Sequence, residues 1–252
     1  MIEEISLKNF KAFQNLNNLE LKPITILCGT NSCGKTSILK SLLMLKQTFE
    51  SQINKTLLLN GSLVNLGRFK NIVHNQDHRN KEINISFEIN TKKSENLGPY
   101  EYRPMKNLIP GPKKSDHPVL KVSFSYIKSL VKYNIEDQIV LNKLLIQTGS
   151  KKEKKFVEYS FFKLVHFPKL TTKKENYELT FKNLPNGYSN KDVSLKKGKV
   201  YLEINKFHSF VPLNVSWENL GIGKLKENLQ QCELYLDNLL KLCQKIFSSY
   251  HY

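Results

Sequence analysis

The sequence predicts an α/β fold in which N-terminal strands lead into a glycine-rich loop and a helix. A β-rich region and a C-terminal helix are expected to follow. Three patterns support this prediction: a glycine-rich motif between an apolar run and a helical repeat, a series of β-like runs from about residue 91 to 215, and helical periodicity after residue 218. We therefore expect three parts, namely an N-terminal lobe over 1–90, a β-rich lobe or insertion over 91–217, and a helical segment over 218–252.

The first 27 residues predict two strands joined by a turn. ISLKNFKAF and LELKPITIL alternate apolar and polar residues with period two, as strands on a sheet face do. The polar run from Asn15 to Asn18 is the turn expected between them. The end of this second segment, PITILCG at residues 23 to 29, is expected to be a short buried strand that leads into the next motif, because β-branched Ile24, Thr25 and Ile26 stand together there.

The stretch GTNSCGKTS, residues 29 to 37, fits the motif G-x-x-x-x-G-K-[ST]. The glycines let the backbone curl so that successive N–H groups point at phosphate oxygens. Lys35 would supply a positive charge to the phosphates, and Thr36 a hydroxyl to Mg²⁺. The predicted cofactors are therefore ATP and Mg²⁺, with Lys35 and Thr36 in the catalytic role and Thr36 as the metal ligand. The predicted binding residues are Gly29, Thr30, Asn31, Ser32, Cys33, Gly34, Lys35, Thr36 and Ser37.

The residues after the motif predict an amphipathic helix that begins near Lys35. Apolar residues recur there at three- and four-residue spacing: Ile38, Leu39, Leu42, Leu43, Leu45 and Phe49. The helix N-terminus would face the phosphates. The alternative is an ordinary glycine-rich turn between a strand and a helix; strand, motif and helix in the required order favour the phosphate loop.

Beyond the helix, a turn is predicted at Asn60–Gly61 and a strand at INISFEI. The later β-like runs are VLKVSFSYI, QIVLNKLLIQ, FVEYSFFKLV, NYELTF and KVYLEINKFHSFVPL. The segment 103–114, which contains three prolines, is expected to be a loop. A helical face is traced near the end by Leu225, Leu229, Cys232, Leu236, Leu239, Leu240, Cys243 and Ile246.

Composition limits the other classes of function. No run of 18 apolar residues and no secretory signal is present, so we expect a cytoplasmic protein without a membrane partner. The four cysteines show no metal-ligand spacing, and His74 with His78 lacks the acidic partner of a zinc-binding helix. The net charge of +17 is compatible with sequence-independent nucleic-acid binding. Only three basic residues are arginine, however, so a solvated lysine surface is an equal alternative.

The N-terminal region resembles a known family. I-x-L-x-N-F-K-A-F, then GTNSCGKTS and ILKSLLMLKQ, is similar to ABC-class P-loop ATPases of the SMC, RecF and overcoming-lysogenisation-defect type. LLLNGSLVNLGRFKNIVHNQD resembles a subset of them, the bacterial "AAA family ATPases" of phage-defence loci. The resemblance covers roughly residues 1 to 90. It implies an antiparallel β-layer packed on the P-loop core. It also implies a loop that senses Mg²⁺ and the γ-phosphate, for which we select Gln76 within His74 to His78; a polar surface turn is the alternative.

The chain departs from this family in its catalytic parts. Such ATPases also need an LSGGE-type signature, a strand ending in Asp-Glu and a switch histidine, and no signature sequence is present. The nearest acidic candidate is CELYLDN, which ends in a segment of helical periodicity, so Asp237 is interpreted as a solvated helix residue. We expect the chain to be an N-terminal portion or one piece of a split ATPase, whose partner subunit or homodimer mate supplies the signature in trans.

Two functions fit these observations. The first is an ATPase subunit that couples nucleotide-dependent assembly to a nucleic-acid or anti-phage effector event. The second is a nucleotide-binding interaction module that does not hydrolyse ATP. The chain alone is expected to be inactive as a hydrolase.

Overall fold

The computed structural model describes residues 2–31, 33–51, 55–76, 82–90, 117–128, 139–152, 155–166, 175–184, 195–208 and 211–216. The elements in order are β1 (Ile2–Phe10), β2 (Phe13–Glu20), α1 (Lys35–Glu50), the 3₁₀ turns η1 (Phe69–Asn71) and η2 (His74–Gln76), β3 (Ile83–Asn90), β4 (His117–Lys128), β5 (Ile139–Lys152), β6 (Lys155–His166), β7 (Glu175–Leu184), β8 (Leu195–His208) and β9 (Val211–Ser216). The predicted C-terminal helix and the 103–114 loop lie outside the described residues.

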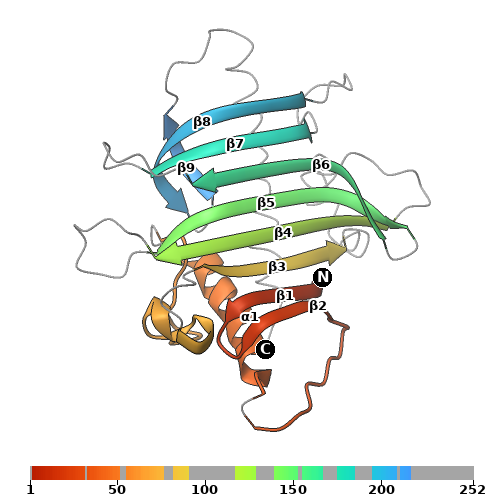
Figure 1. The fold of residues 1–252 in the computed structure, drawn as a ribbon, viewed down its shortest axis with the longest axis vertical. Helices are drawn as coiled ribbons and strands as arrows, with labels where there is room; N and C mark the ends of the chain where they lie inside the picture. The colour runs from red at the N-terminus through yellow and green to blue at the C-terminus, as the bar shows by residue number, and fades with distance from the viewer. Residues whose placement is uncertain are drawn as a thin grey trace.

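All nine strands form one antiparallel sheet in the order β2-β1-β3-β4-β5-β6-β7-β8-β9. Figure 1 shows α1 lying against one face of this sheet, next to β1 and β3. The predicted α/β architecture, with an antiparallel β-layer on the helix and a β-rich continuation, is confirmed. The strand pairing continues from β3 to β4 over eight registered positions. The proposed division of the chain near residue 90 stays a prediction.

The face of the sheet toward α1 is apolar because period-two alternation aligns buried residues across successive strands. One cross-strand row consists of Leu7, Ile85, Phe124, Leu144, Leu164 and Leu179, and the next consists of Ile5, Phe87, Val122, Ile146 and Phe162. Every residue of these two rows is at most 1% exposed. The β-like runs predicted beyond residue 80 therefore correspond to real strands, β3 to β9.

The helix α1 joins this core through its apolar side. Ile38, Leu42, Leu45 and Phe49 are buried in the same cluster as the sheet residues. The ring of Phe49 lies 6.4 Å from that of Phe124 on β4, centroid to centroid. Burial of such side chains stabilises the fold by roughly 1.5–3 kcal/mol each. The helix is therefore held by packing on the sheet.

The segment after α1 is held by two polar side chains of the helix that are themselves buried. Gln47 donates to the Leu58 carbonyl at 2.7 Å and accepts from the Val64 amide at 3.0 Å. The Thr48 hydroxyl accepts from the Leu58 amide at 3.0 Å and donates to the Met44 carbonyl. A predicted turn at Asn60–Gly61 agrees with the hydrogen bond from the Gly61 amide to Val64. These bonds fasten residues 58–64 to the C-terminal half of α1.

Two local predictions were wrong. The first turn lies at Lys11 and Ala12, between β1 and β2, and the run from Asn15 to Asn18 is part of β2. Lys11 adopts the left-handed backbone conformation, with φ of 48°, that a two-residue hairpin turn requires. The Asn-rich run is accommodated as an edge strand with a register shift, where the Asn18 amide donates to the Ser6 hydroxyl at 2.8 Å.

The buried strand predicted over residues 23–29 is absent. These residues carry no strand, and Ile24 and Ile26 are 84% and 80% exposed. Figure 1 shows the segment as a loop that runs outside the sheet between β2 and α1. A β-branched run becomes a strand only where a neighbouring strand offers hydrogen bonds. Both edges of β1 are already occupied by β2 and β3.

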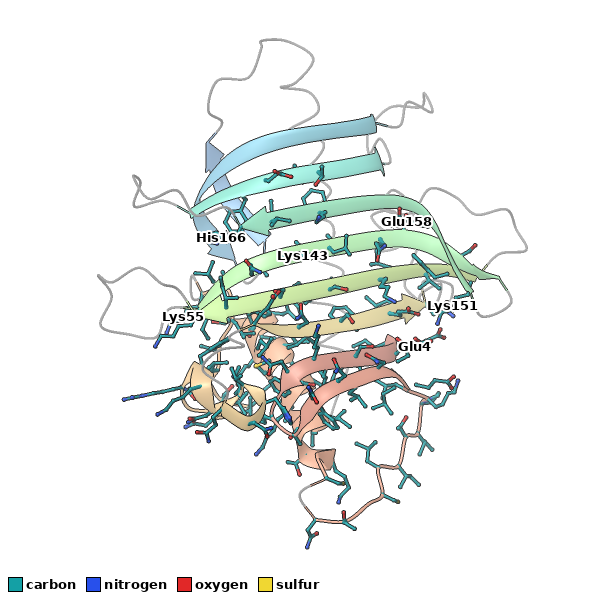
Figure 2. The ribbon with its side chains drawn as sticks, viewed as in Figure 1. Glu4, Lys55, Lys143, Lys151, Glu158 and His166 are labelled. Carbon is teal, nitrogen blue, oxygen red and sulfur yellow. The ribbon has the colours of Figure 1, made fainter. Side chains whose placement is uncertain are left out.

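The opposite face of the sheet carries a network of charges at the end where β1 begins. Glu4 and Glu88 are directly opposite each other on β1 and β3. Lys151, from β5, forms an ion pair with Glu4 and another at 2.6 Å with Glu88, and Lys121 pairs with Glu88 at 2.9 Å. Figure 2 shows Glu4 and Lys151 at the same end of the sheet. The two lysines neutralise a pair of carboxylates that would otherwise repel each other.

This network shifts the pKa values of Glu88 and Lys151. Burial raises the pKa of Glu88, but hydrogen bonds from Lys151 and Lys121, and their charges, outweigh it, so the pKa lies below its ordinary value. Burial lowers the pKa of Lys151, yet hydrogen bonds to Glu4 and Glu88 leave it above its ordinary value. The stabilisation from Glu88 is therefore present above its ordinary pKa of 4.5 and is lost as pH falls through its lower folded-state value. The stabilisation from Lys151 is lost only in alkali.

We predict that Lys151→Met lowers the free energy of unfolding at pH 7 by about 2 kcal/mol. This loss of stability is smaller than that expected for breaking a fully buried ion pair, because the Lys151 side chain is 26% exposed. Urea denaturation followed by circular dichroism measures the change. Lys143→Met is the matched control, since Lys143 lies on the same strand and has no ion-pair partner among the described residues. The difference from wild type should shrink below pH 4.5; a difference that is constant down to pH 2 would contradict the ion-pair explanation.

Candidate nucleotide-binding site

The backbone of residues 29–34 requires glycine at both ends. Gly29 has φ of 152° and Gly34 has φ of 101°, conformations that residues with a side chain rarely adopt. A Cβ at Gly34 would stand 2.5 Å from Cζ of Phe13 and 3.1 Å from Cβ of Ala12. A Cβ at Gly29 would stand 2.9 Å from the Cys33 sulfur. The spacing of the two glycines in the motif is thus explained by close packing as well as by backbone conformation.

The helix begins at Lys35, as the sequence predicts. Gly34 is its N-cap and provides no side-chain cap, and the Gly34 carbonyl accepts from the amides of Ser37 at 2.9 Å and Ile38 at 3.2 Å. The first turn contains no acidic residue. The amide groups at the start of α1 and the positive end of its dipole therefore face the loop without a neighbouring carboxylate.

The Lys35 ammonium lies inside the loop. Its Nζ donates to the carbonyl of Gly29 at 2.7 Å and that of Thr30 at 2.6 Å, and it lies 3.6 Å from the Cys33 sulfur. Lys35, at the C-terminal end of the motif, thus binds the carbonyls at its N-terminal end through one positively charged group. Thr30, Asn31 and Cys33 are exposed around it, while Ser32 lies outside the described residues.

The turn between β1 and β2 connects this loop to the segment after η1. On one side, Ala12 and Phe13 contact Gly34. On the other, the Lys11 amide donates to the Ile72 carbonyl at 2.7 Å, and the His74 ring nitrogen Nδ1 lies 2.8 Å from the Lys11 carbonyl. Residues 11–13 therefore stand between the phosphate loop and residues 72–74, which are about forty positions apart in the sequence.

Lys11 adds a second positive charge to this region. Its pKa lies below its ordinary value, first because burial disfavours the charged form and then because Lys40 of α1 lies nearby. Its Nζ is 3.5 Å from the Asn71 carbonyl, the limit of a hydrogen bond. A cation in such surroundings gains when an anion approaches, which suits a phosphate-binding region.

Gln76, selected as the residue that senses the γ-phosphate, is exposed at the end of η2. No hydrogen bond joins it to residues 29–37 among those that the structure describes. It and Asn75 both have φ of 51°, a left-handed conformation that costs a residue such as glutamine about 1 kcal/mol or more. The structure brings its segment to the phosphate loop only indirectly, through His74 and Lys11. His78 lies outside the described residues.

The residues fit an ATP phosphate group, and Mg²⁺ in part. Two glycines that exclude a Cβ, the helix start and the Lys35 ammonium, which is hydrogen-bonded to the loop, form a cradle suited to phosphate. Thr36 is exposed in the first turn of α1, where its hydroxyl could bind Mg²⁺ that is otherwise held by phosphate oxygens and water. Among the described residues no group of three or more His, Cys, Asp or Glu could hold a metal ion.

Sequence reasoning missed the part played by Lys11, Ala12 and Phe13. They stand within the motif that carries the family resemblance, but alternation over ISLKNFKAF assigned them to a strand. Their signal was the pair Lys-Ala between two aromatic residues, which places a two-residue turn between the paired Phe10 and Phe13. The role of His74 had no local signal, because its partner is 63 positions away.

Comparison with known proteins gives one family. Residues 1–246 match the family described as "AAA ATPase domain". No curated protein matches the chain. Among the described residues, no helix combines the length and apolar character needed to cross a membrane.

We predict that Gly34→Ala weakens nucleotide binding by at least about 5-fold, because alanine strains φ of 101° and its Cβ meets the Phe13 ring. Strain of this kind costs about 1–3 kcal/mol. Binding of fluorescent mant-ATP at fixed Mg²⁺ measures the effect. In the double variant with Phe13→Leu the steric contact is relieved but the backbone strain remains, so binding should recover only partly. Wild-type affinity in Gly34→Ala would contradict the described loop conformation.

Proposed function

The chain belongs to the AAA ATPase domain family, and from that membership we propose that residues 29–37 are where it binds ATP with Mg²⁺. The family identifies it as a P-loop ATPase of the AAA type. We further propose that it is of the SMC, RecF and overcoming-lysogenisation-defect kind, as its N-terminal motifs suggest.

The observation that carries the binding proposal is the position of the Lys35 ammonium. It lies within hydrogen-bonding distance of two loop carbonyls, at the start of a helix whose amides face the same loop. Phosphate oxygens are stronger partners for an ammonium than neutral carbonyls are. On binding, Lys35 would exchange Gly29 and Thr30 for the β- and γ-phosphates, and the loop amides would bind the remaining oxygens.

Hydrolysis needs parts that this sequence does not supply. The 252-residue sequence contains neither an LSGGE-type signature nor an Asp-Glu pair that could end such a strand. We propose that a homodimer mate or a partner subunit provides the signature in trans, so that ATP binding promotes assembly and assembly permits attack by water. The alternative is a module that binds ATP only to order a partner interface.

The event to which assembly is coupled is proposed to involve nucleic acid or a defence effector. The net charge of +17 supports a polyanionic partner. Lys151 contributes to this charge, but it forms ion pairs with Glu4 and Glu88 and is less available to phosphate. A contact between DNA and the β-rich half would therefore depend on other lysines.

We predict that Lys35→Ala weakens binding of ATP·Mg²⁺ by roughly 10- to 150-fold, the loss of a charge-assisted contact of about 1.5–3 kcal/mol. Isothermal titration calorimetry measures the affinity. Lys143→Ala is the matched control, since it removes the same charge from a strand far along the chain from the loop. Equal affinity in Lys35→Ala and wild type would exclude this site.

We also predict negligible steady-state hydrolysis by the pure chain, because its sequence has no LSGGE-type signature and no Asp-Glu pair to activate water. Release of inorganic phosphate at saturating ATP measures this, with Lys35→Ala reporting any contaminating ATPase. Phosphate release that depends on Lys35 would show that a catalytic carboxylate lies within this chain, and Glu233 and Asp237 would be the first to replace.

A further inference from the structure

We propose that His74 is a positioning residue for the nucleotide site, and this inference rests on the function proposed above. Its imidazole fixes the Lys11 carbonyl and thereby the turn that packs against Gly34. His74 does not itself contact residues 29–37 among those described. His74 would therefore affect the affinity for nucleotide indirectly, by fixing the positions of Lys11 and Phe13.

The hydrogen-bond partner of the imidazole determines which of its ring nitrogens carries the proton. Nδ1 lies 2.8 Å from a backbone carbonyl oxygen, which can only accept a hydrogen bond. Nδ1 must therefore carry the proton, and the neutral ring must be the Nδ1–H tautomer. The protonated ring also donates from Nδ1, so the contact survives in both charge states.

The contact acts at a point where the backbone is strained. Lys11 has φ of 48°, and the same residue is held by its amide to the Ile72 carbonyl. Two opposed hydrogen bonds, one on the amide and one on the carbonyl, fix the orientation of both peptide planes that flank Lys11. Without the His74 contact, rotation of the Lys11–Ala12 peptide is limited only by the pairing of Phe10 with Phe13 and by the amide bond of Lys11.

That carbonyl side leads directly to the phosphate loop. Ala12 follows it, and the Phe13 ring lies where a Cβ on Gly34 would be. Rotation of the Lys11–Ala12 peptide would change the backbone that leads into Phe13 and so shift its ring relative to Gly34. Loss of the His74 contact should therefore weaken nucleotide binding while the core, which is formed by the sheet and α1, remains folded.

Three substitutions at His74 distinguish the effect of losing the hydrogen bond from the effect of losing side-chain volume. In His74→Asn, the side-chain Nδ2 can take the place of the imidazole Nδ1 and donate to the same carbonyl. His74→Ala removes the donor, and His74→Asp places an acceptor opposite an acceptor. We expect the affinity for mant-ATP with Mg²⁺ to fall about 5- to 10-fold in His74→Ala. It should fall at least as far in His74→Asp and return to within about 2-fold of wild type in His74→Asn.

His166→Asn is the matched control, since His166 lies on β6 against Tyr177 and outside the site. It should bind mant-ATP as the wild type does. Urea titration of each variant establishes the fraction folded at the assay temperature. Equal losses in His74→Asn and His74→Ala at full folding would overturn the positioning role.

The tautomer provides a test that does not depend on ATP. Long-range ¹H–¹⁵N correlation spectra of ¹⁵N-histidine-labelled protein above pH 8, assigned by the loss of one ring in His74→Asn, should show His74 as the Nδ1–H form. An Nε2–H form would overturn the inference whatever the binding data are. Absence of mant-ATP binding by the wild type would instead refute the proposed function, and the positioning role with it.

Discussion

The packing of α1 on the apolar face of the sheet is the contact on which the rest of the structure depends. Its buried residues share one core with β1, β3 and β4, and the ring contact between Phe49 and Phe124 lies at its C-terminal end. The N-terminal end of the same helix carries the phosphate loop. Because a packed helix is rigid, the position of Lys35 is set by side chains up to four turns away from it.

The same helix organises the segment that follows. Gln47 and Thr48 bind the backbone of residues 58–64, and that segment leads through η1 to the contact between Ile72 and Lys11. The chain therefore returns to the phosphate loop from the other side, with the β1–β2 turn enclosed between the two. An arrangement of this kind allows a change at the loop to reach residues 72–76 through contacts alone.

The two faces of the sheet differ in the polarity of their side chains. The face toward α1 is a continuous apolar surface, and the other face carries polar residues, among them the paired charges of Glu4, Glu88, Lys121 and Lys151. Lys151 illustrates why net charge is a weak guide to partners: it contributes to the +17 of the chain but is engaged by Glu4 and Glu88. An ion pair within the protein reduces the attraction of a lysine for phosphate.

Pattern and motif in the sequence determined much of this protein. β-like runs predicted the strands from β3 onward, with β8 and β9 inside one run, three- and four-residue spacing predicted α1 and its start near Lys35, and the two glycines predicted the loop. These signals are local, since each residue reports its own burial or backbone conformation. The tertiary structure decided what depends on neighbours: that Ile24 and Ile26 form no strand, that the first turn lies at Lys11, and that His74 meets the Lys11 carbonyl. A strand needs a free sheet edge and a hydrogen bond needs its partner, and the partners here are brought together only by the folded chain.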